Sequence, residues 1–517
     1  MVMPSILFLD TEIIPNEPQY FRDLNLDQVA NHLFAGMDPW KPLFYTALVT
    51  TEAVMHRQQV MRDVEKVGIL SALRSFTSAM RELESLRHRS ETAYYLLQRH
   101  LWFLEAAYTY CQLVETLAIH LVDGEGMESE GLRAVLHYVL EYAASDAFRS
   151  LVRETAQRRA ELRAIRYSLH LRGNVVTVSA DEDATNYCRH VEDIFDRFHS
   201  HTENDKSKVV RDPPDMNHVE AQILDRVARL NPEPFEELAA FVERYRDRFV
   251  DPGISQFDFE VQFYVKYREF MHALIQPDLS FCYPEIAVDG GDIFSYGAFD
   301  AALAEKLGQI HRIPTLNDFY LHDREQIAVV TGPNQGGKST FARMVGQVSH
   351  LARLGLPVPG KRARLPLCDR IFTHFERGES SPHVEGKLAD DLQRVRAILE
   401  EATSQSLVIL NEIFSSTTLK DAKFLGERIL SSISEKGATA VVVTFIEEWA
   451  DLNEKTVSLV SEVLPDNPSL RTFKILRKPT SGRSYAMTLA QKHRLTYEEI
   501  KERIGNASAL DEPRASV

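Results

Sequence analysis

One run, Thr331-Gly-Pro-Asn-Gln-Gly-Gly-Lys-Ser-Thr340, carries the residue types and the spacing best suited to chemistry in this chain. It contains the Gly-x-x-x-x-Gly-Lys-Ser pattern of a P-loop, whose backbone N–H groups cradle phosphate oxygens. In that pattern Lys338 reaches the β- and γ-phosphates of a nucleotide, and Ser339 ligates Mg²⁺. The pattern predicts nucleotide contacts from Gly332, Pro333, Asn334, Gln335, Gly336, Gly337, Lys338, Ser339 and Thr340.

The residues on either side of this run predict the two elements that must position it. Residues 326–331 are mostly apolar and predict a buried strand, and residues 341–351 predict the helix that follows. The N-terminus of such a helix adds partial positive charge at the phosphate site. A chance match in a glycine-rich turn is the alternative, and the strand and helix context argues against it.

A second apolar run, residues 406–411, ends in Asn411 and Glu412. Ligands lie at the carboxyl ends of strands in parallel sheets. Many P-loop enzymes have Asp then Glu here, for orienting Mg²⁺ through water and for activating the attacking water. Asn411 accepts a hydrogen bond from a metal-bound water but brings no charge, whereas Glu412 is the predicted general base. The alternative is an ordinary buried strand capped by polar residues.

The sequence pattern divides the rest of the chain into a helical part and a part in which strands and helices alternate. The 517 residues are enough for several domains. Residues 1 to about 280 predict long helices, apart from a hairpin of 165–171 and 175–179 around a Gly-Asn turn. From about 280, strands alternate with helices, which predicts a mostly parallel sheet covered on both faces. The predicted strands are 326–331, 369–374, 406–411, 439–444 and 471–477.

Composition excludes several classes of protein. The net charge of −16 argues against a uniformly basic nucleic-acid coat, so any DNA contact must use a local patch. No apolar run is long enough to span a membrane. The four cysteines show neither zinc spacing nor a disulfide framework. We therefore expect a cytoplasmic protein that does not insert into membranes.

Together with residues 361–373, the P-loop run resembles the MutS family of ATP-dependent DNA mismatch-repair proteins. The likeness is strong over about 310–500, where Ser481-Gly-Arg-Ser-Tyr485 resembles the last ATPase strand. It is weaker over 20–280, where 42–44 and 56–60 resemble the start of the core helical domain. The resemblance implies ATP and Mg²⁺ as cofactors, Lys338 and Glu412 as catalytic residues, and Ser339 and Asn411 at the metal. It also implies a homodimer in which each partner completes the other's site.

The resemblance implies a multidomain α and α/β fold, with a long-helix core or lever, a small β-containing clamp and an ABC-type P-loop ATPase domain. We expect the following segments: 1–149, N-terminal segment and helical core or lever; 150–215, clamp; 216–280, returning lever helices; 281–505, ATPase domain; 506–517, disordered tail.

The expected clamp is locally basic. Between positions 153 and 172 there are six arginines and only two acidic residues, Glu154 and Glu161. This excess of positive charge is suited to contact with a phosphate backbone. A solvated helix face paired with acidic neighbours is the alternative, and the resemblance favours sequence-independent contact with duplex DNA. The arginines are Arg153, Arg158, Arg159, Arg163, Arg166 and Arg172.

The sequence departs from the family pattern in its N-terminal part. The family's mismatch-sensing domain precedes the core and inserts a Phe-x-Glu wedge, whereas only some 20–40 residues precede the core-like helices here. The tripeptides that begin at Phe103 and Phe241 lie inside helical patterns, so we interpret both as packing residues. Direct reading of mismatches is therefore not expected.

Three further departures lie in the ATPase segment. Asn411 replaces Asp, and Gly386 stands where the family has its signature Ser, with Ser380, Ser381 and Lys387 nearby. Val443-Thr-Phe-Ile446 stands where a switch His is expected. The hydroxyl-rich loop 415–421 is kept and either lines a dimer seam or caps a helix. Together these changes predict a slow ATPase.

Two classes of function follow. The first is an ATP-driven, DNA-binding dimeric clamp in mismatch repair or related repair and recombination. The second is a nucleotide-switched protein-interaction module without DNA affinity, which the acidic composition and the altered site residues favour. A P-loop kinase is a weaker third, since no sequence feature indicates a second-substrate pocket or a lid.

Overall fold

The computed structural model describes residues 3–7, 10–123, 126–180, 216–275, 277–288, 290–376, 387–415, 417–464, 467–479, 496–497 and 500–501. The chain forms two compact units. We call Met1–Ser5 with Asp63–Gln262 the helical unit, and Ile6–Arg62 with Phe263–Val517 the sheet unit. Two helices, α4 (Thr51–Val64) and α12 (Pro252–Leu274), run from one unit into the other. The segment boundaries expected from the sequence stay predictions.

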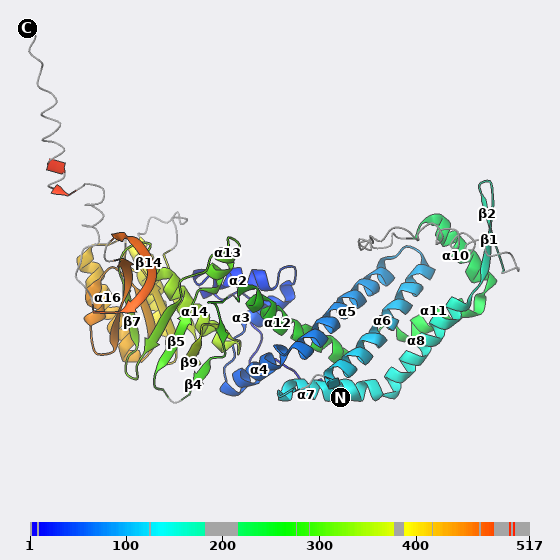
Figure 1. The fold of residues 1–517 in the computed structure, drawn as a ribbon, viewed down its shortest axis with the longest axis horizontal. Helices are drawn as coiled ribbons and strands as arrows, with labels where there is room; N and C mark the ends of the chain where they lie inside the picture. The colour runs from blue at the N-terminus through cyan, green and yellow to red at the C-terminus, as the bar shows by residue number, and fades with distance from the viewer. Residues whose placement is uncertain are drawn as a thin grey trace, which may run out of the picture. The chain divides into compact units, whose positions relative to one another are not determined.

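Long helices build the helical unit, as the apolar spacing predicts. The helices α5 and α6 lie side by side as a hairpin (Figure 1). Side chains of Ser129 and Ser145 cap the N-termini of α7 and α8, and Asn217 forms a capping box at α10. The helices are α5 (Val67–Thr92), α6 (Leu96–Asp123), α7 (Glu130–Ala144), α8 (Asp146–Ala164), α10 (His218–Leu230) and α11 (Pro232–Tyr245), with the first part of α12.

The predicted hairpin in the expected clamp is confirmed. Strands β1 (Tyr167–Arg172) and β2 (Val175–Ala180) pair antiparallel, with Arg172 opposite Val175. Gly173 in the turn has φ of +60°, a backbone angle that glycine adopts without strain. The rest of the expected clamp, residues 181–215, lies outside the described residues.

A six-stranded sheet forms the centre of the sheet unit, in the order β10-β11-β12-β7-β13-β14. Every neighbouring pair is parallel except β13 and β14, which confirms the mostly parallel sheet. All five predicted strands are present, and β13 is a strand that the sequence analysis did not identify. The strands are β7 (Ile327–Thr331), β10 (Ile371–His374), β11 (Leu407–Asn411), β12 (Thr439–Val443), β13 (Thr456–Leu464) and β14 (Asn467–Arg477).

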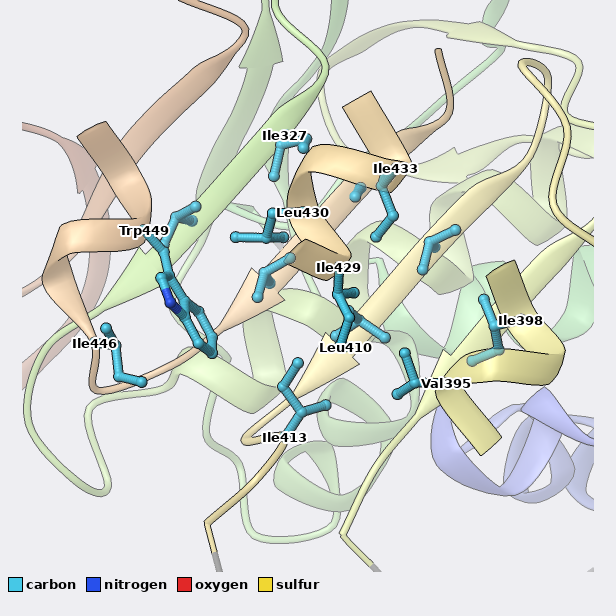
Figure 2. Packing of buried hydrophobic residues seen from close by; sticks show 14 of the residues in the cluster. Ile327, Val395, Ile398, Leu410, Ile413, Ile429, Leu430, Ile433, Ile446 and Trp449 are labelled. Atoms are coloured by element: carbon cyan, nitrogen blue, oxygen red, sulfur yellow. The ribbon is translucent and has the colours of Figure 1, made fainter. Parts of the chain in front are cut away.

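Helices α15 (Lys387–Glu401) and α16 (Leu419–Lys436) cover one face of this sheet (Figure 2). Their apolar side chains pack with Leu410 of β11 and with Trp449, which is fully buried. Each such burial contributes about 1.5–3 kcal/mol. Gly426 is required in α16, because a Cβ there would lie 1.9 Å from the indole ring of Trp449.

Helix α14 (Lys338–Arg353) covers the opposite face. Strand side chains alternate between faces, so Ile409 points away from Leu410 and towards α14. A Cβ on Gly346 of α14 would lie 2.9 Å from Ile409 and 2.6 Å from Leu24. The N-terminal segment therefore packs on the outer side of α14. Its helices are α1 (Tyr20–Asp23), α2 (Leu26–Leu33) and α3 (Lys41–Tyr45), with the 3-10 turn η1 (Asp38–Trp40).

A second sheet, ordered β4-β9-β5-β6, was not expected from the sequence. Its strands are short and partly charged, so they lack a clear hydrophobic pattern. They are β4 (Glu285–Ala287), β5 (Ile293–Ala298), β6 (Asn317–Leu321) and β9 (Arg362–Pro366), with α13 (Ala301–Gly308) between β5 and β6. The short pair β3 (Phe281–Cys282) and β8 (Val358–Pro359) and the 3-10 turn η2 (Glu447–Asp451) complete the unit.

The buried Arg57 joins the N-terminal part of the sheet unit to the segment that follows α14. Its Nε donates to the Leu7 carbonyl at 2.7 Å, and its Nη1 donates to the Leu354 carbonyl at 3.1 Å. Charged hydrogen bonds of this kind contribute about 1.5–3 kcal/mol. The described helices include none that is both long and apolar enough to cross a membrane.

Candidate nucleotide-binding site

The P-loop connects β7 to α14, as its pattern predicts. Gly332 and Gly337 have φ of +123° and +90°, in the region that L side chains rarely adopt. Ser461 of β13 lies directly beside the loop, and its Oγ donates to the Gly336 carbonyl at 2.7 Å. A Cβ on Gly336 would lie 2.2 Å from that Oγ, and one on Gly332 would lie 2.8 Å from the Ser461 Cβ. The glycines are therefore needed both for the turn and for the close approach of β13.

Lys338 is buried and folded back on its own loop. Its Nζ donates to the Gly332 carbonyl at 2.9 Å and to the Pro333 carbonyl at 3.1 Å. The same Nζ lies 4.4 Å from the ring centre of Phe445, a cation–π contact. Burial lowers the pKa of Lys338, the nearby Glu412 carboxylate opposes that shift, and Arg471 adds to it. An anion bound in the loop would therefore stabilise the charged form of Lys338.

Asn411 and Glu412 stand at the carboxyl end of β11, as predicted. The Glu412 N–H donates to the Val443 carbonyl at 2.9 Å, which holds the residue beside the end of β12. Its φ is +54°, a conformation that costs a non-glycine residue roughly 1–3 kcal/mol. The buried Asn411 Oδ1 has no hydrogen-bond partner among the described residues. The site thus combines a strained backbone at Glu412 with an unsatisfied amide oxygen at Asn411.

A cavity of about 650 Å³ joins these parts. One wall consists of P-loop residues 335–340 with Glu412. The other wall is largely apolar and includes Leu303, Ile313, Pro314 and Phe473. A cavity with a phosphate-binding wall and an apolar wall suits a nucleotide, whose base is flat and apolar and whose phosphates are charged.

The sequence analysis missed the apolar wall. Its residues come from α13, from the segment after it and from β14, which is far from both in the chain. Asn317 holds the last two together, since its Nδ2 donates to the Phe473 carbonyl at 3.1 Å and its Oδ1 accepts from the Ile475 N–H at 2.8 Å. Phe473 has φ of +59°, and this strained backbone is a signal that only the structure provides.

The predicted site residues are brought together to different degrees. Residues 335–340 and Glu412 line the cavity, while the Gly332 and Pro333 carbonyls accept from Lys338 and Asn334 is exposed. Gly386, Ser380, Ser381 and the expected last strand at 481–485 lie outside the described residues. The side chain of Lys387 is likewise not described.

The donor set fits a magnesium ion that is bound mainly through phosphate and water. Within the described part of the chain, no group of three or more His, Cys, Asp or Glu side chains could hold a metal by itself. Mg²⁺ in phosphate sites usually takes one or two protein ligands and keeps several waters. Ser339 at the start of α14 would supply a direct ligand, and the orphaned Asn411 Oδ1 could accept from a metal-bound water.

The six arginines of the expected clamp fall into two groups. Arg158 pairs with Glu161 and Glu237, each at 3.0 Å. Arg159 makes two hydrogen bonds to Glu105, at 2.9 and 2.7 Å, and lies over the Tyr108 ring. The exposed group is Arg153, Arg163, Arg166 and Arg172. Within the described residues, Arg163, Arg166 and Arg172 make no ion pair, so the exposed group is the better candidate for phosphate contacts.

Residues 328–510 match the family model of MutS domain V. Over these residues the chain is similar to that domain. The chain is similar to the DNA mismatch repair protein MutS of Aquifex pyrophilus, with 33% identity over 36% of this chain. The corresponding protein of Thermosipho melanesiensis is 32% identical over 34% of this chain. Endonuclease MutS2 of Thermus thermophilus is 30% identical over 36%.

The likeness to these MutS-family proteins is confined to part of each of them. The chain covers 22% of the length of the two mismatch repair proteins and 25% of the endonuclease. The matched region holds the P-loop, Asn411 and Glu412, which agrees with the resemblance seen in the sequence. The mixed helical and α/β architecture also agrees with the expected fold class.

Proposed function

We propose that this chain is an ATP-binding MutS-family ATPase that acts as a dimeric, DNA-binding clamp in mismatch repair or a related repair or recombination process. The observation that carries the proposal is the cavity shared by the P-loop, Glu412 and a largely apolar wall. The family match over 328–510 supports the same conclusion.

In this proposal each part of the cavity has one task. The N–H groups of residues 335–340 and the ammonium of Lys338 bind the triphosphate, and the wall around Phe473 holds the base. Mg²⁺, held by Ser339 and by the Asn411 amide through water, neutralises phosphate charge. Glu412 accepts a hydrogen bond from the attacking water and orients it for in-line displacement.

Two features favour slow turnover. Asn411 brings no carboxylate to the metal, so it stabilises the ion less than Asp would. Phe445, at the expected switch position, offers Lys338 an aromatic face and no hydrogen bond to a phosphate. Lys338 must leave this ring and the two loop carbonyls before it reaches the γ-phosphate. We propose that DNA binding and dimer closure assist this step.

The proposed DNA contact uses phosphates only. Arg153, Arg163, Arg166 and Arg172 are exposed and would bind the duplex backbone without reading sequence. Phe103 and Phe241 are buried, and their ring centroids are 6.0 Å apart, which supports their interpretation as packing residues. Neither tripeptide can serve as an inserted wedge, so we propose that this chain does not read mismatches directly through them.

A nucleotide-switched protein-interaction module remains the second candidate. The pairing of Arg158 and Arg159 with glutamates, together with the net charge of −16, favours it.

The deciding experiment measures the ATPase rate and DNA affinity with matched, mismatched and branched duplexes across a salt series. The DNA-clamp proposal predicts steeply salt-dependent binding and similar affinity for matched and mismatched duplexes. A clear preference for a single mismatch would contradict the second point. Absence of DNA binding at low salt, with ATP binding intact, would favour the interaction module.

A further inference from the structure

The helical unit contains a cavity of about 620 Å³ that the proposed ATPase and clamp functions do not use. It lies between the α5–α6 turn and the connection from α11 to α12. Four arginines line it, two from each side: Arg87, Arg99, Arg246 and Arg248. Glu91 and Asp247 are its acidic lining residues, so guanidinium groups outnumber carboxylates two to one.

Two of these arginines are held by weak local ion pairs. Arg87 pairs with Glu84 at 3.3 Å and Arg246 with Glu243 at 3.7 Å, and each pair spans three residues of chain at an exposed position. Such surface pairs contribute about 0–1 kcal/mol, so an anion in the cavity can compete for the guanidinium groups.

The other two arginines make no ion pair within the described residues. The Nε of Arg99 donates to the Ala93 carbonyl at the end of α5, which fixes the base of its guanidinium group. Its two terminal nitrogens have no hydrogen-bond acceptor in the described part of the chain. Arg248 is exposed at the opposite edge of the cavity. The fixed guanidinium group of Arg99 is well suited to bidentate binding of phosphate.

His100 also lines the cavity. Burial lowers the pKa of His100, and the positive charge of Arg246 lowers it further. The imidazole therefore lies in the positive field of Arg246, which would also attract an anion.

The cavity also has an apolar floor. Phe103, Val242 and Phe249 line it and are buried, and the rings of Phe103 and Phe249 meet edge to face with centroids 5.1 Å apart. An apolar floor below a cationic rim suits a small molecule that has both an organic part and phosphate groups. Its volume lies within the range of small-ligand cavities, about 300–1,000 Å³.

We propose that this cavity binds a small phosphate-bearing anion of the nucleoside polyphosphate class, at a site separate from the P-loop. Arg99 and Arg248 clamp the phosphates, while the apolar floor accommodates the organic part. The proposal does not rest on the ATPase function, because the cavity lies within the helical unit.

The test uses the full chain carrying Lys338→Ala, which removes the P-loop as a competing site. Calorimetric titrations are made with pyrophosphate, GTP and guanosine. Arg99→Gln with Arg248→Gln is the test pair. Arg226→Gln with Arg229→Gln on α10 is the matched control, because both residues are exposed arginines of the same unit that do not line the cavity. Circular dichroism melting establishes that each variant is folded.

We expect saturable one-to-one binding of pyrophosphate and tighter binding of GTP, with no binding of guanosine alone. The test pair should weaken both by at least about tenfold through the loss of charged hydrogen bonds, and the control pair should change them less than twofold. Absence of binding, or equal losses in both pairs, would overturn the proposal. So would normal anion binding by the test pair, or a loss confined to duplex DNA affinity, which would make the surface a DNA contact.

Discussion

The two proposed anion-binding cavities differ in the groups that line them. The P-loop cavity uses backbone N–H groups, a helix N-terminus and one buried lysine, Lys338. The cavity of the helical unit uses four arginine side chains on flexible stems. A backbone cradle requires glycines at fixed spacing, so it leaves a motif in the sequence. A side-chain cluster assembled from distant helices leaves no such motif, and it becomes visible only when the chain is folded.

Loss of Lys338 should have the largest effect on nucleotide binding in the P-loop cavity. Lys338→Ala removes the one ammonium of the backbone cradle and leaves triphosphate charge uncompensated. ATP affinity measured by calorimetry should fall by about 100-fold or more, as for a lost charged contact of about 3 kcal/mol. Pyrophosphate binding in the helical unit should persist. Unchanged ATP affinity would refute the P-loop assignment.

Glu412→Gln should separate binding from turnover. The amide keeps the size of the side chain but cannot accept a proton from water. We expect ATP affinity to stay within about threefold, while the steady-state ATPase rate falls about 10²–10⁴-fold, the usual contribution of a general base. Glu427→Gln, on α16 and outside the cavity, is the control. Turnover that survives Glu412→Gln would place the base elsewhere.

Charge reversal in the expected clamp tests the difference between its two groups of arginines. Exchange of the exposed arginines for Glu should weaken all duplexes equally. It should also reduce the slope of log affinity against log salt by about 3–4, near 0.9 for each phosphate contact. The substitutions are Arg153→Glu, Arg163→Glu, Arg166→Glu and Arg172→Glu.

The paired arginines serve as the comparison for this charge reversal. Arg158→Glu with Arg159→Glu should instead lower the melting temperature, because Glu105 and Glu237 lose their partners. An equal effect of both sets of substitutions on DNA affinity would contradict the division of these arginines into an exposed and a paired group.

Phe445→Ala should have the smallest effect. The ring contacts the Lys338 ammonium at 4.4 Å, and a cation–π contact of this kind contributes about 0.5–1 kcal/mol. Its removal should release Lys338 and tighten ATP binding about two- to fivefold. Phe424→Ala, which removes another exposed ring of the sheet unit, is the control. Weaker ATP binding by Phe445→Ala would show that the ring supports the nucleotide.

The sequence predicted those parts of the fold and site that depend on local patterns. The P-loop, Asn411 and Glu412 follow from short motifs, and all five predicted strands are present. Strand β9 was missed because it carries Arg362 and Arg364 and has no long apolar run. The apolar wall at Phe473 was missed because it forms between segments far apart in the chain.

Ion pairs between residues far apart in the chain could not be predicted from the sequence, for the same reason. Arg159 and Glu105 lie 54 positions apart, and Arg158 and Glu237 lie 79 apart. Neither pairing leaves a periodic signal, so the six arginines of the expected clamp looked equivalent. Only packing of α8 against its neighbours separates the paired from the exposed group.

The most direct test of the central claim is the site of photo-labelling by 8-azido-ATP, mapped by mass spectrometry of the digested protein. The account predicts labelling within residues 303–317 or at Phe473, because these line the apolar wall that would hold the base. Excess ATP should prevent this labelling, and Lys338→Ala should abolish it while leaving any labelling of the helical-unit cavity intact. ATP-competed labelling of other parts of the sheet unit, with none within these residues, would contradict the account.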